Sequence, residues 1–418
     1  MVAPTAASSY AVVNATLLTM APLAARVDGD ARVGEDDLGI IRDATVVVRD
    51  GVIVDVVHGR VNSTAPFSDD QTIDAQGCVV MPGFVDAHTH ALFAGDRVAD
   101  LEALARGEPP ALGIAYTVEQ TRKLDLEGLI DAGRRRLAAM LEHGTTTAEV
   151  KTGYDLTAAG ESTALRALAA LDRMSAVPHV IATFCGAHAL PPEFASYDAF
   201  VDELIAAILP AAAETGVARF ADAFCERGYF TPRQSARFLE ACAARGMQLR
   251  IHADELGASG GAALAARLHC ISADHLNFID DADIAGLRDA GTIAVLCPAT
   301  AAYLGLARFA PARALIGAGV PVALATDFNP GTCPCYSLQE VAHVARRRLG
   351  MSAPEVIAGI TVLAARSLDA AGVAGCIAPG RPADLVQLQT RDFRELGYYF
   401  GVNLAAWSSV GSKGEHVA

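Results

Sequence analysis

Two histidines separated by one residue are the first feature of the sequence that could perform chemistry. They are His88 and His90, and they follow or end the mainly apolar stretch 83–87. Side chains two residues apart in an extended strand project from the same face, so we expect both imidazoles to point the same way. Neutral imidazoles are common ligands of Zn2+ and related ions. The pair therefore predicts one half of a metal site.

Three more residues at the ends of apolar stretches could complete this site. His252 and His275 each end such a stretch, and Asp327 closes a third. A carboxylate in that position is expensive to bury unpaired, which favours a metal ion or a hydrogen-bond partner beside Asp327. His252 is followed by Asp254 and Glu255, which can transfer protons. Three imidazoles and a carboxylate that leave a position for water are typical of a catalytic Zn2+ or iron centre, although each residue alone could be structural.

These stretches belong to a regular alternation of apolar strands with Ala-rich helical segments. Eight strands are expected at 83–87, 146–150, 180–187, 221–225, 248–252, 271–275, 293–296 and 322–326. The alternation predicts a closed parallel (β/α)8 barrel of TIM type, whose active site lies at the carboxyl ends of the strands. An open doubly wound sheet is the alternative, but it would carry a G-x-G-x-x-G loop where this chain has His-Thr-His. The Pro- and Gly-rich stretch 106–113 is expected to be a loop and is a candidate lid.

The two ends of the chain show another pattern, of short strands rich in Val and Ile. Such strands are expected at 11–18, 44–49, 51–57, 73–80 and 385–389. The chain has 418 residues, more than the roughly 250 of a barrel, which leaves room for an accessory domain. We therefore expect a small β-sandwich domain from residues 1–80 together with 376–418, and a metal-dependent catalytic barrel from residues 81–375.

Composition argues against several classes of function. The formal net charge is −15 and no long Lys/Arg run occurs, so no nucleic-acid partner is expected. The nine cysteines are scattered without a C-x-x-C pair, unlike those of a secreted disulfide scaffold. No uncharged apolar run reaches the roughly 18 residues of a membrane span, and the N-terminus lacks a signal-peptide pattern. We therefore expect a cytoplasmic protein without a membrane partner.

The motif around the two histidines resembles a known signature. Residues 82–90, Pro-Gly-Phe-Val-Asp-Ala-His-Thr-His, are similar to the first barrel strand of the amidohydrolase superfamily, which also has a small β-domain made from both chain ends. Within it, further stretches resemble the imidazolonepropionase family: 95–97, 149–154, 186–191, 252–256, 272–276 and 325–332. The resemblance runs through nearly the whole chain. It implies a metal-dependent hydrolase that opens an imidazolone ring bearing a propionate, a step of histidine degradation.

The resemblance also implies a role for each matching residue. The ligands of one metal ion, Zn2+ in first place and iron in second, would be His88, His90, His252 and Asp327. The catalytic residues that handle the nucleophilic water and its proton would be Glu255, His275 and Asp327. The substrate would be held by Arg97, Tyr154, His188 and Asn329.

General chemistry is consistent with this division of roles. A metal ion lowers the pKa of its water toward about 7 and polarises the attacked carbonyl. The Glu255 carboxylate could accept the proton of the water and return it to the leaving nitrogen. The Arg97 fork is well shaped for the propionate carboxylate. The expected partner is thus a small molecule with a carboxylate tail, and the family resemblance implies a homodimer.

Each substrate residue also has a structural interpretation. Arg97 could form a salt bridge within its loop, and Tyr154 could cap the core with its hydroxyl in water. His188 could be a satisfied core histidine, and Asn329 could only shape the Asn-Pro-Gly turn. Lys151 could bridge two metals as a carboxylated lysine, but the family uses one metal, so we expect Lys151 to support the site from behind.

Several stretches expected to line the pocket depart from the family pattern, namely 111–114, 257–258, 296–303 and 333–335. A retained metal centre with an altered wall favours retained chemistry on a changed substrate. The alternative function is therefore a sibling desulfhydrase that hydrolyses the 2-thioxo analogue, 3-(5-oxo-2-thioxoimidazolidin-4-yl)propionate, and releases hydrogen sulfide, as in ergothioneine degradation. Cys297, Cys333 and Cys335 would suit a softer sulfur atom, although small apolar filling is the simpler interpretation.

Other classes of function rank lower. A deaminase of the same superfamily would share the His-Thr-His start but would not explain Arg97, Tyr154 and His188. A non-catalytic binding barrel needs no proton shuttle, yet Glu255 and His275 are both present. A scaffold protein is disfavoured because all four ligand positions hold competent residues. The remaining histidines are expected to be structural or at the surface: His58, His143, His179, His269, His343 and His416.

Overall fold

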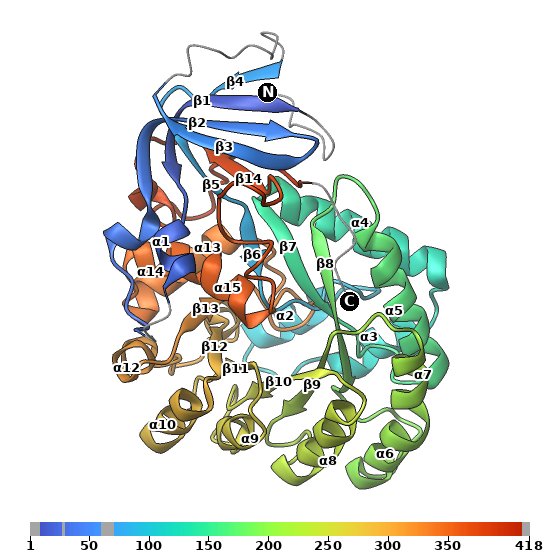
Figure 1. Cartoon of the computed structure of the whole chain (residues 1–418). Coiled ribbons are helices and arrows are strands. Elements are labelled where there is room, and N and C mark those ends of the chain that lie inside the picture. The colour runs from blue at the N-terminus through green and yellow to red at the C-terminus, as the bar shows by residue number, and fades with distance from the viewer. Residues whose placement is uncertain (1–8, 27–29, 60–70, 412–418) are drawn as a thin grey trace.

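The computed structural model describes residues 9–26, 30–59 and 71–411, which form two sheets, one of them surrounded by helices (Figure 1). One sheet has eight strands and the other has seven. The seven-stranded sheet lies at the top of Figure 1, where the blue strands near the N-terminus accompany the red strand β14. The eight-stranded sheet and its helices fill the rest of the view. His416 lies outside the described residues.

The eight-stranded sheet is a parallel barrel. Its order is β6 to β13 in sequence, and each strand pairs in parallel with the next. The strands are β6 Phe84–Asp86, β7 Thr145–Lys151, β8 His179–Ala187, β9 Phe220–Cys225, β10 Gln248–Ala253, β11 Ser272–His275, β12 Ile293–Leu296 and β13 Val322–Leu324. All eight expected strands are present within a few residues of their expected positions, so the (β/α)8 prediction is confirmed.

The seam between β6 and β13 closes the barrel just beyond the strand ends. The amide of Asp327 donates to the carbonyl of His88 over 2.9 Å, and the amide of His90 donates to the carbonyl of Phe328 over 2.9 Å. Below them, the Thr326 hydroxyl donates to the Asp86 carboxylate over 2.6 Å. Because β6 ends at Asp86, the two histidines lie after the strand and not within it. The seam keeps their backbone aligned with that of Asp327.

Helices α2 to α12 connect successive barrel strands, α13 to α15 follow the last barrel strand, and α1 lies between two strands of the other sheet. They are α1 Ala21–Ala25, α2 Val98–Ala105, α3 Gly113–Thr121, α4 Leu126–Glu142, α5 Ala158–Asp172, α6 Tyr197–Glu203, α7 Leu209–Glu214, α8 Pro232–Ala243, α9 Gly261–Arg267, α10 Asp281–Ala290, α11 Pro298–Tyr303, α12 Ala312–Ala318, α13 Leu338–Val344, α14 Ala353–Gly359 and α15 Val362–Ser367. Several begin at a side chain that accepts a hydrogen bond from the third backbone amide after it, as Asp125, Thr157 and Thr231 do. In the described part of the chain, no helix combines the length and apolar character that a membrane crossing requires.

The expected loop near the site is present. Residues 106–112, between α2 and α3, form neither helix nor strand and are exposed to solvent. Two more short segments are 3-10 turns, Glu35–Leu38 and Phe393–Glu395, and two are π-helical turns, Leu204–Ile208 and Ala345–Leu349.

The seven-stranded sheet combines both ends of the chain. Its order is β15-β14-β5-β1-β2-β3, with β4 paired to β1. The bounds are β1 Tyr10–Leu18, β2 Ile40–Arg49, β3 Val52–His58, β4 Thr72–Asp74, β5 Val79–Pro82, β14 Leu385–Leu388 and β15 Ala405–Ser409. Pairing between β14 and β5 brings the C-terminal strands onto the N-terminal ones, as expected. The boundaries of this domain at residues 80 and 376 stay a prediction.

The prediction of a single strand at 73–80 is wrong. The chain forms two strands there, β4 and β5, which pair with different parts of β1. Gln76 and Gly77 between them have positive φ angles of 56° and 78°. A left-handed pair of residues turns the chain and interrupts an extended strand. The apolar pattern of the segment did not reveal this turn.

The interior contains two buried hydrophobic clusters. The larger one joins barrel strands to the inner faces of the helices and includes Leu165, Phe184 and Phe238. The smaller one lies within the seven-stranded sheet and includes Val12 and Trp407. The packed barrel core holds the strand ends in place, and the polar side chains at those ends form the site described next.

Candidate active site and metal centre

Four side chains selected from the sequence converge at the carboxyl end of the barrel. His88 and His90 follow β6, His252 lies in β10, and Asp327 follows β13. Asp327 Oδ1 lies 3.5 Å from His88 Nε2 and 3.7 Å from His90 Nε2. His90 Nε2 lies 3.2 Å from His252 Nε2. All four side chains are buried, so their ligand atoms share a small space that solvent scarcely reaches.

The Nδ1 atoms of two imidazoles face carboxylates that set the tautomer. His88 Nδ1 lies 2.6 Å from Asp274 Oδ2, and His252 Nδ1 lies 2.9 Å from Asp222 Oδ1. A carboxylate at Nδ1 favours the proton on that nitrogen and leaves the Nε2 lone pair for a metal ion. Among the described residues, the buried Nε2 of His88 has no hydrogen-bond partner. A three-imidazole, one-carboxylate donor set with such an unpartnered nitrogen fits a divalent metal ion.

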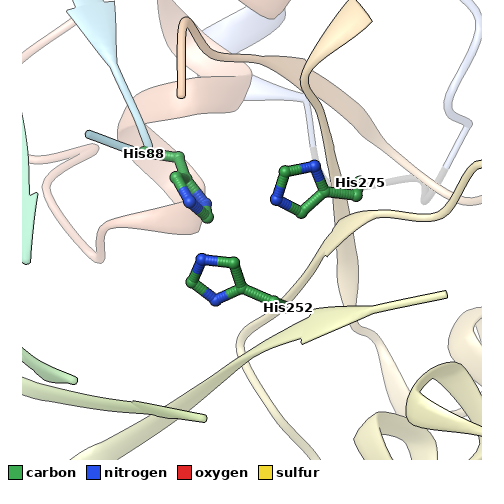
Figure 2. A group of neighbouring side chains, drawn as sticks. All are labelled: His88, His252 and His275. Carbon is green, nitrogen blue, oxygen red and sulfur yellow. The ribbon is translucent and has the colours of Figure 1, made fainter. Parts of the chain in front are cut away.

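Glu255 and His275 lie next to the four candidate metal ligands. The loop after β10 carries Glu255, and His275 is the last residue of β11. The two side chains approach to 3.8 Å between Oε2 and Nε2. Figure 2 shows the rings of His88, His252 and His275 facing a common space, and these three residues offer ligand atoms within 4.8 Å of one another. His275 therefore lies close enough to act beside a metal ion.

Burial changes the acidity of these groups. Burial raises the pKa of Glu255 well above its ordinary value, and the charges of Asp327 and Glu226 act in the same direction. Burial also raises the pKa of Asp327, to about 6. Burial lowers the pKa of His275 well below its ordinary value, and the neighbouring His252 adds to that effect. A carboxylate that binds protons readily and a neutral imidazole are a suitable pair for proton transfer near neutral pH.

Two of the site residues have a strained backbone. His275 has a φ angle of 73° and Asp327 has a φ angle of 53°, both in the left-handed region. Residues other than glycine adopt this region at a cost of roughly 1–3 kcal/mol, and such strain concentrates at functional sites. At these positions the chain turns sharply at the end of a barrel strand.

A cavity of about 150 Å³ opens onto these groups. A cavity of about that size can hold a single small ring. It is lined by His90, Arg97, Pro110, Gly113, Ile114, Tyr154, His188, Phe224, Tyr229, His252, Glu255, Leu256, His275, Asp327, Asn329 and Thr332. All four residues expected to hold the substrate border it. Pro110 and Gly113 bring the candidate lid to its edge.

One nitrogen of the Arg97 side chain is held by Asp100, and the other two are available to a ligand. Its Nε donates to Asp100 Oδ2 over 2.6 Å, so the interpretation as a loop salt bridge is correct in part. Among the described residues, neither terminal nitrogen of Arg97 has a hydrogen-bond partner. The guanidinium lies against Gly331, where an added Cβ would come within 2.0 Å of Nη1. Gly331 thus makes room for the guanidinium at the cavity wall.

His188 and Tyr154 form an aromatic side of the cavity. The His188 ring stacks on the His90 ring with a centroid distance of 4.7 Å, and its Nδ1 lies 2.9 Å from the Gly153 carbonyl oxygen. That contact makes Nδ1 the donor, so neutral His188 presents Nε2 as an acceptor. Burial lowers the pKa of His188 to about 4, which keeps it neutral. The Tyr154 ring centroid lies 5.1 Å from that of His188.

Asn329 is occupied mainly by its own turn. Its Oδ1 accepts hydrogen bonds from the amides of Gly331 and Thr332 over 2.8 and 2.7 Å. Its Nδ2 donates to the Asp327 carbonyl over 2.7 Å. The side chain therefore shapes the Asn-Pro-Gly turn and the backbone of Asp327. Direct contact with a substrate would require one of these bonds to be exchanged.

The cysteines near the site do not border the cavity. Cys297, Cys333 and Cys335 are absent from its lining, and burial raises the pKa of each thiol. Neutral, enclosed thiols of this kind act as small apolar side chains. This geometry agrees with the simpler interpretation of these residues.

Several residues around the site were not assigned a role from the sequence. They are Asp100, Asp222, Phe224, Tyr229, Arg250 and Asp274. One signal was available for Asp222, which lies between alanines in an apolar strand, where an unpaired carboxylate is costly. Asp274 directly precedes His275 and was noted only as part of that motif. For Tyr229 and Asp100 no sequence pattern pointed to the site.

Comparison with known proteins shows the family to which the chain belongs. Residues 79–416 match the amidohydrolase family, and the chain belongs to that family. Among solved structures, its fold is similar to an adenosine deaminase from Xanthomonas campestris with bound zinc, with a TM-score of 0.69 and 19% identity over 97% of this chain and 92% of that one. A mutant of the atrazine chlorohydrolase TrzN from Arthrobacter aurescens, complexed with zinc and atraton, has a TM-score of 0.70 at 16% identity over 97% and 94% of the two chains.

Within the amidohydrolase family, the sequence is similar to imidazolonepropionases. The protein of that name from Symbiobacterium thermophilum is 41% identical, over 90% of this chain and 92% of its own. The one from Geobacillus kaustophilus is 40% identical over 90% and 91%. The one from Bdellovibrio bacteriovorus is 38% identical over 96% and 95%.

Proposed function

We propose that this protein is a metal-dependent hydrolase of the imidazolonepropionase type. It opens a five-membered imidazolone ring that carries a propionate, by hydrolysis of a ring C–N bond. The observation that carries this proposal is the cavity in which a three-histidine, one-aspartate donor set faces Glu255 and His275, with Arg97 on its wall. The similarity to imidazolonepropionases over about nine-tenths of the chain supports the choice of substrate.

One metal ion belongs at the donor set, held by His88, His90, His252 and Asp327. When bound, Zn2+ or iron supplies Lewis acidity toward the ring carbonyl and toward the attacking water. Imidazole and carboxylate ligands accept both metals, and we place Zn2+ first. His275 is assigned to the substrate, because the family resemblance gives this residue a part in proton handling and Glu255 lies beside it at 3.8 Å.

Glu255 and His275 carry the proton chemistry. Glu255 takes a proton from the attacking water and returns it to the ring nitrogen that leaves, which its raised pKa favours. The two ring nitrogens of His275 have no hydrogen-bond partner among the described residues. His275 can therefore donate a hydrogen bond to the ring oxygen as negative charge develops on it.

The substrate is held from the other side of the cavity. The terminal nitrogens of Arg97 donate a forked pair of hydrogen bonds to the propionate carboxylate. His188 accepts a ring N–H at its Nε2, and the Tyr154 ring packs beside the bound ring. Asn329 supports this side through the Asp327 backbone.

The experiment that tests this function uses purified protein stripped of metal and then loaded with Zn2+ or Fe2+. Each sample receives the imidazolone propionate or its 2-thioxo analogue, and both ring absorbance and released sulfide are followed. Metal-dependent turnover of the imidazolone supports the proposal. If the metal is bound and neither compound is consumed, the substrate assignment is wrong. Sulfide release from the thioxo compound alone would replace the proposal with the sibling reaction, which no specific observation in the structure or the comparisons now favours.

We also propose that the protein is a homodimer, as the family resemblance implies, and that it works in the cytoplasm. Light scattering coupled to gel filtration tests the dimer, and a monomer peak over the working concentration range would contradict it. Cell fractionation with an antibody against this chain tests the location.

A further inference from the structure

Five charged side chains lie buried beneath the metal ligands, and the proposed mechanism uses none of them. They are Glu149, Lys151, Asp222, Arg250 and Asp274, and each is fully buried. They come from strands β7, β9, β10 and β11. Burial of charge is costly unless every charge has partners, and hydrophobic replacements are often at least as stable. A network of five therefore needs an explanation beyond stability.

Lys151 lies at the centre of this network. Its Nζ lies 2.7 Å from Asp222 Oδ2, 2.8 Å from Glu149 Oε1 and 3.9 Å from Asp274 Oδ2. Arg250 is the second cation, with Nη2 at 3.1 Å from Asp274 Oδ2. Three carboxylates thus surround two cations.

Each carboxylate also reaches out to the metal site. Asp222 Oδ1 contacts Nδ1 of His252 at 2.9 Å, and Asp274 Oδ2 contacts Nδ1 of His88 at 2.6 Å. Glu149 Oε2 accepts the backbone amide of Thr89, the residue between the two histidines after β6, over 3.1 Å. Arg250 joins the same segment by donating to the Ala87 carbonyl over 2.7 Å.

We infer that Lys151 is a positioning residue for the metal site, acting through Asp222 and Asp274. The Lys151 ammonium pairs with Asp222 Oδ2 at 2.7 Å, which favours a negatively charged or partly negative oxygen at that position and leaves Oδ1 to accept the Nδ1 proton of His252. The Nε2 lone pair of His252 then points to the metal. Asp274 holds His88 through a single oxygen, Oδ2, which His88 Nδ1 and both cations face. This inference rests on the proposed function only in requiring a metal ion at the donor set.

The decisive variant is Asp222→Asn. With Lys151 in place, the full charge of the ammonium attracts the amide oxygen more strongly than the backbone amide of His252 does, which donates to Oδ1 over 3.2 Å. We therefore expect the amide NH2 to face His252 Nδ1. That reverses the tautomer of His252 and places a proton on Nε2, which cannot then bind a metal ion. We expect Zn2+ affinity to fall by about 10- to 100-fold or more, the range known for outer partners of metal ligands. The visible spectrum of the Co2+-loaded protein should change as well, because one ligand is lost.

The double variant Lys151→Met/Asp222→Asn separates positioning from a merely structural role. It has the same net charge in the network as the unmodified protein, since one cation and one anion are removed together. Without Lys151 the amide is free to turn its oxygen to His252, so we expect the double variant to regain part of the Zn2+ affinity and of the Co2+ spectrum. Effects that simply add, with weaker binding than in either single variant, would overturn the inference.

A matched control lies at the other end of the barrel. Asp384 Oδ1 lies 3.2 Å from His179 Nε2, a buried carboxylate–histidine pair far from the ligands in the fold. Asp384→Asn makes the same substitution and should leave Zn2+ affinity unchanged. Melting temperatures of the metal-free proteins are measured in parallel. Loss of stability in Asp222→Asn with unchanged Zn2+ affinity would assign the network to folding alone and contradict the inference.

Two further safeguards keep the test decisive. If Asp222→Asn does not fold, Lys151→Met is measured alone with both carboxylates in place, and unchanged Zn2+ affinity there would overturn the inference. The readouts need no substrate. If the unmodified protein binds no metal, the proposed function fails; if it binds metal and the variants bind equally well, only the role of Lys151 fails.

Discussion

Asp100 holds Arg97 and the candidate lid with one carboxylate. Its Oδ2 accepts the Nε of Arg97 over 2.6 Å, while its Oδ1 accepts the backbone amide of Leu112 over 2.6 Å. The amide of Gly113, the first residue of α3, adds a contact of 3.1 Å. Arg97, which we propose binds the substrate carboxylate, is thus linked through Asp100 to the loop that borders the cavity.

This link predicts that Asp100→Asn weakens substrate binding more than turnover. The amide oxygen can still serve Leu112, but the NH2 group would oppose the Nε–H of Arg97 and release the guanidinium. A charge-assisted hydrogen bond is worth about 1.5–3 kcal/mol, so we expect KM to rise by about 10- to 100-fold with a smaller change in kcat. Steady-state kinetics measure both constants. Glu108→Gln, which removes only the exposed pair with Arg106 in the same loop, is the control and should change neither.

Glu255→Gln tests the proton shuttle. Gln has the same shape but cannot accept and return a proton, so kcat should fall by about 10²- to 10⁴-fold while KM changes little. The bound metal, measured by elemental analysis, should stay the same because Glu255 is not among the proposed ligands. Activity within a factor of about ten of the unmodified enzyme would assign the proton transfer to another group.

Tyr229 is predicted to form the wall over the substrate ring. Its ring centroid lies 4.3 Å from that of Phe224, and Phe224 in turn lies 5.4 Å from His252. Tyr229→Ala removes a planar apolar surface from the cavity, so KM should rise by roughly tenfold. Tyr229→Phe keeps the ring and should change KM by less than about twofold. Equal effects of the two variants would mean that the hydroxyl, and not the ring, is the important group.

The raised pKa of Asp86 should make the stability of the protein depend on pH. Burial raises the pKa of this carboxyl to about 7, while hydrogen bonds from Thr326 and His88 act against that rise. A pKa raised in the folded state contributes stability that is complete below the unfolded value of 3.8 and is lost as pH rises through about 7. Asp86→Asn does not titrate, so its melting temperature relative to the unmodified protein should increase between about pH 4 and pH 8.

Differential scanning calorimetry of the metal-free proteins measures this difference. We expect a relative gain of a few degrees for Asp86→Asn at about pH 8 compared with about pH 4. The amide can still bond to Thr326, whose hydroxyl both donates and accepts. A difference in melting temperature that is the same at every pH would show that Asp86 stays ionised throughout.

The barrel and the donor types were predictable from local patterns. Apolar strands alternate with Ala-rich helices, and this periodicity depends only on which faces are buried. His88, His90, His252, His275 and Asp327 each end an apolar stretch, and parallel strands of a barrel all end on the same side. Residue type and position along the chain were therefore enough to bring these five together.

Only the tertiary structure decided which groups act on each other across the barrel. Asp222 meets His252, Asp274 meets His88, and Lys151 joins both carboxylates, although these residues lie far apart in the sequence. Such pairings depend on strand register and on side-chain rotamers within tenths of an ångström, which no local pattern encodes. The same reason explains why Asp100, on a helix beside the site, appeared in no motif. Residue types and their periodicity determined the class of site, while packing across the closed barrel decided its tautomers and its charge balance.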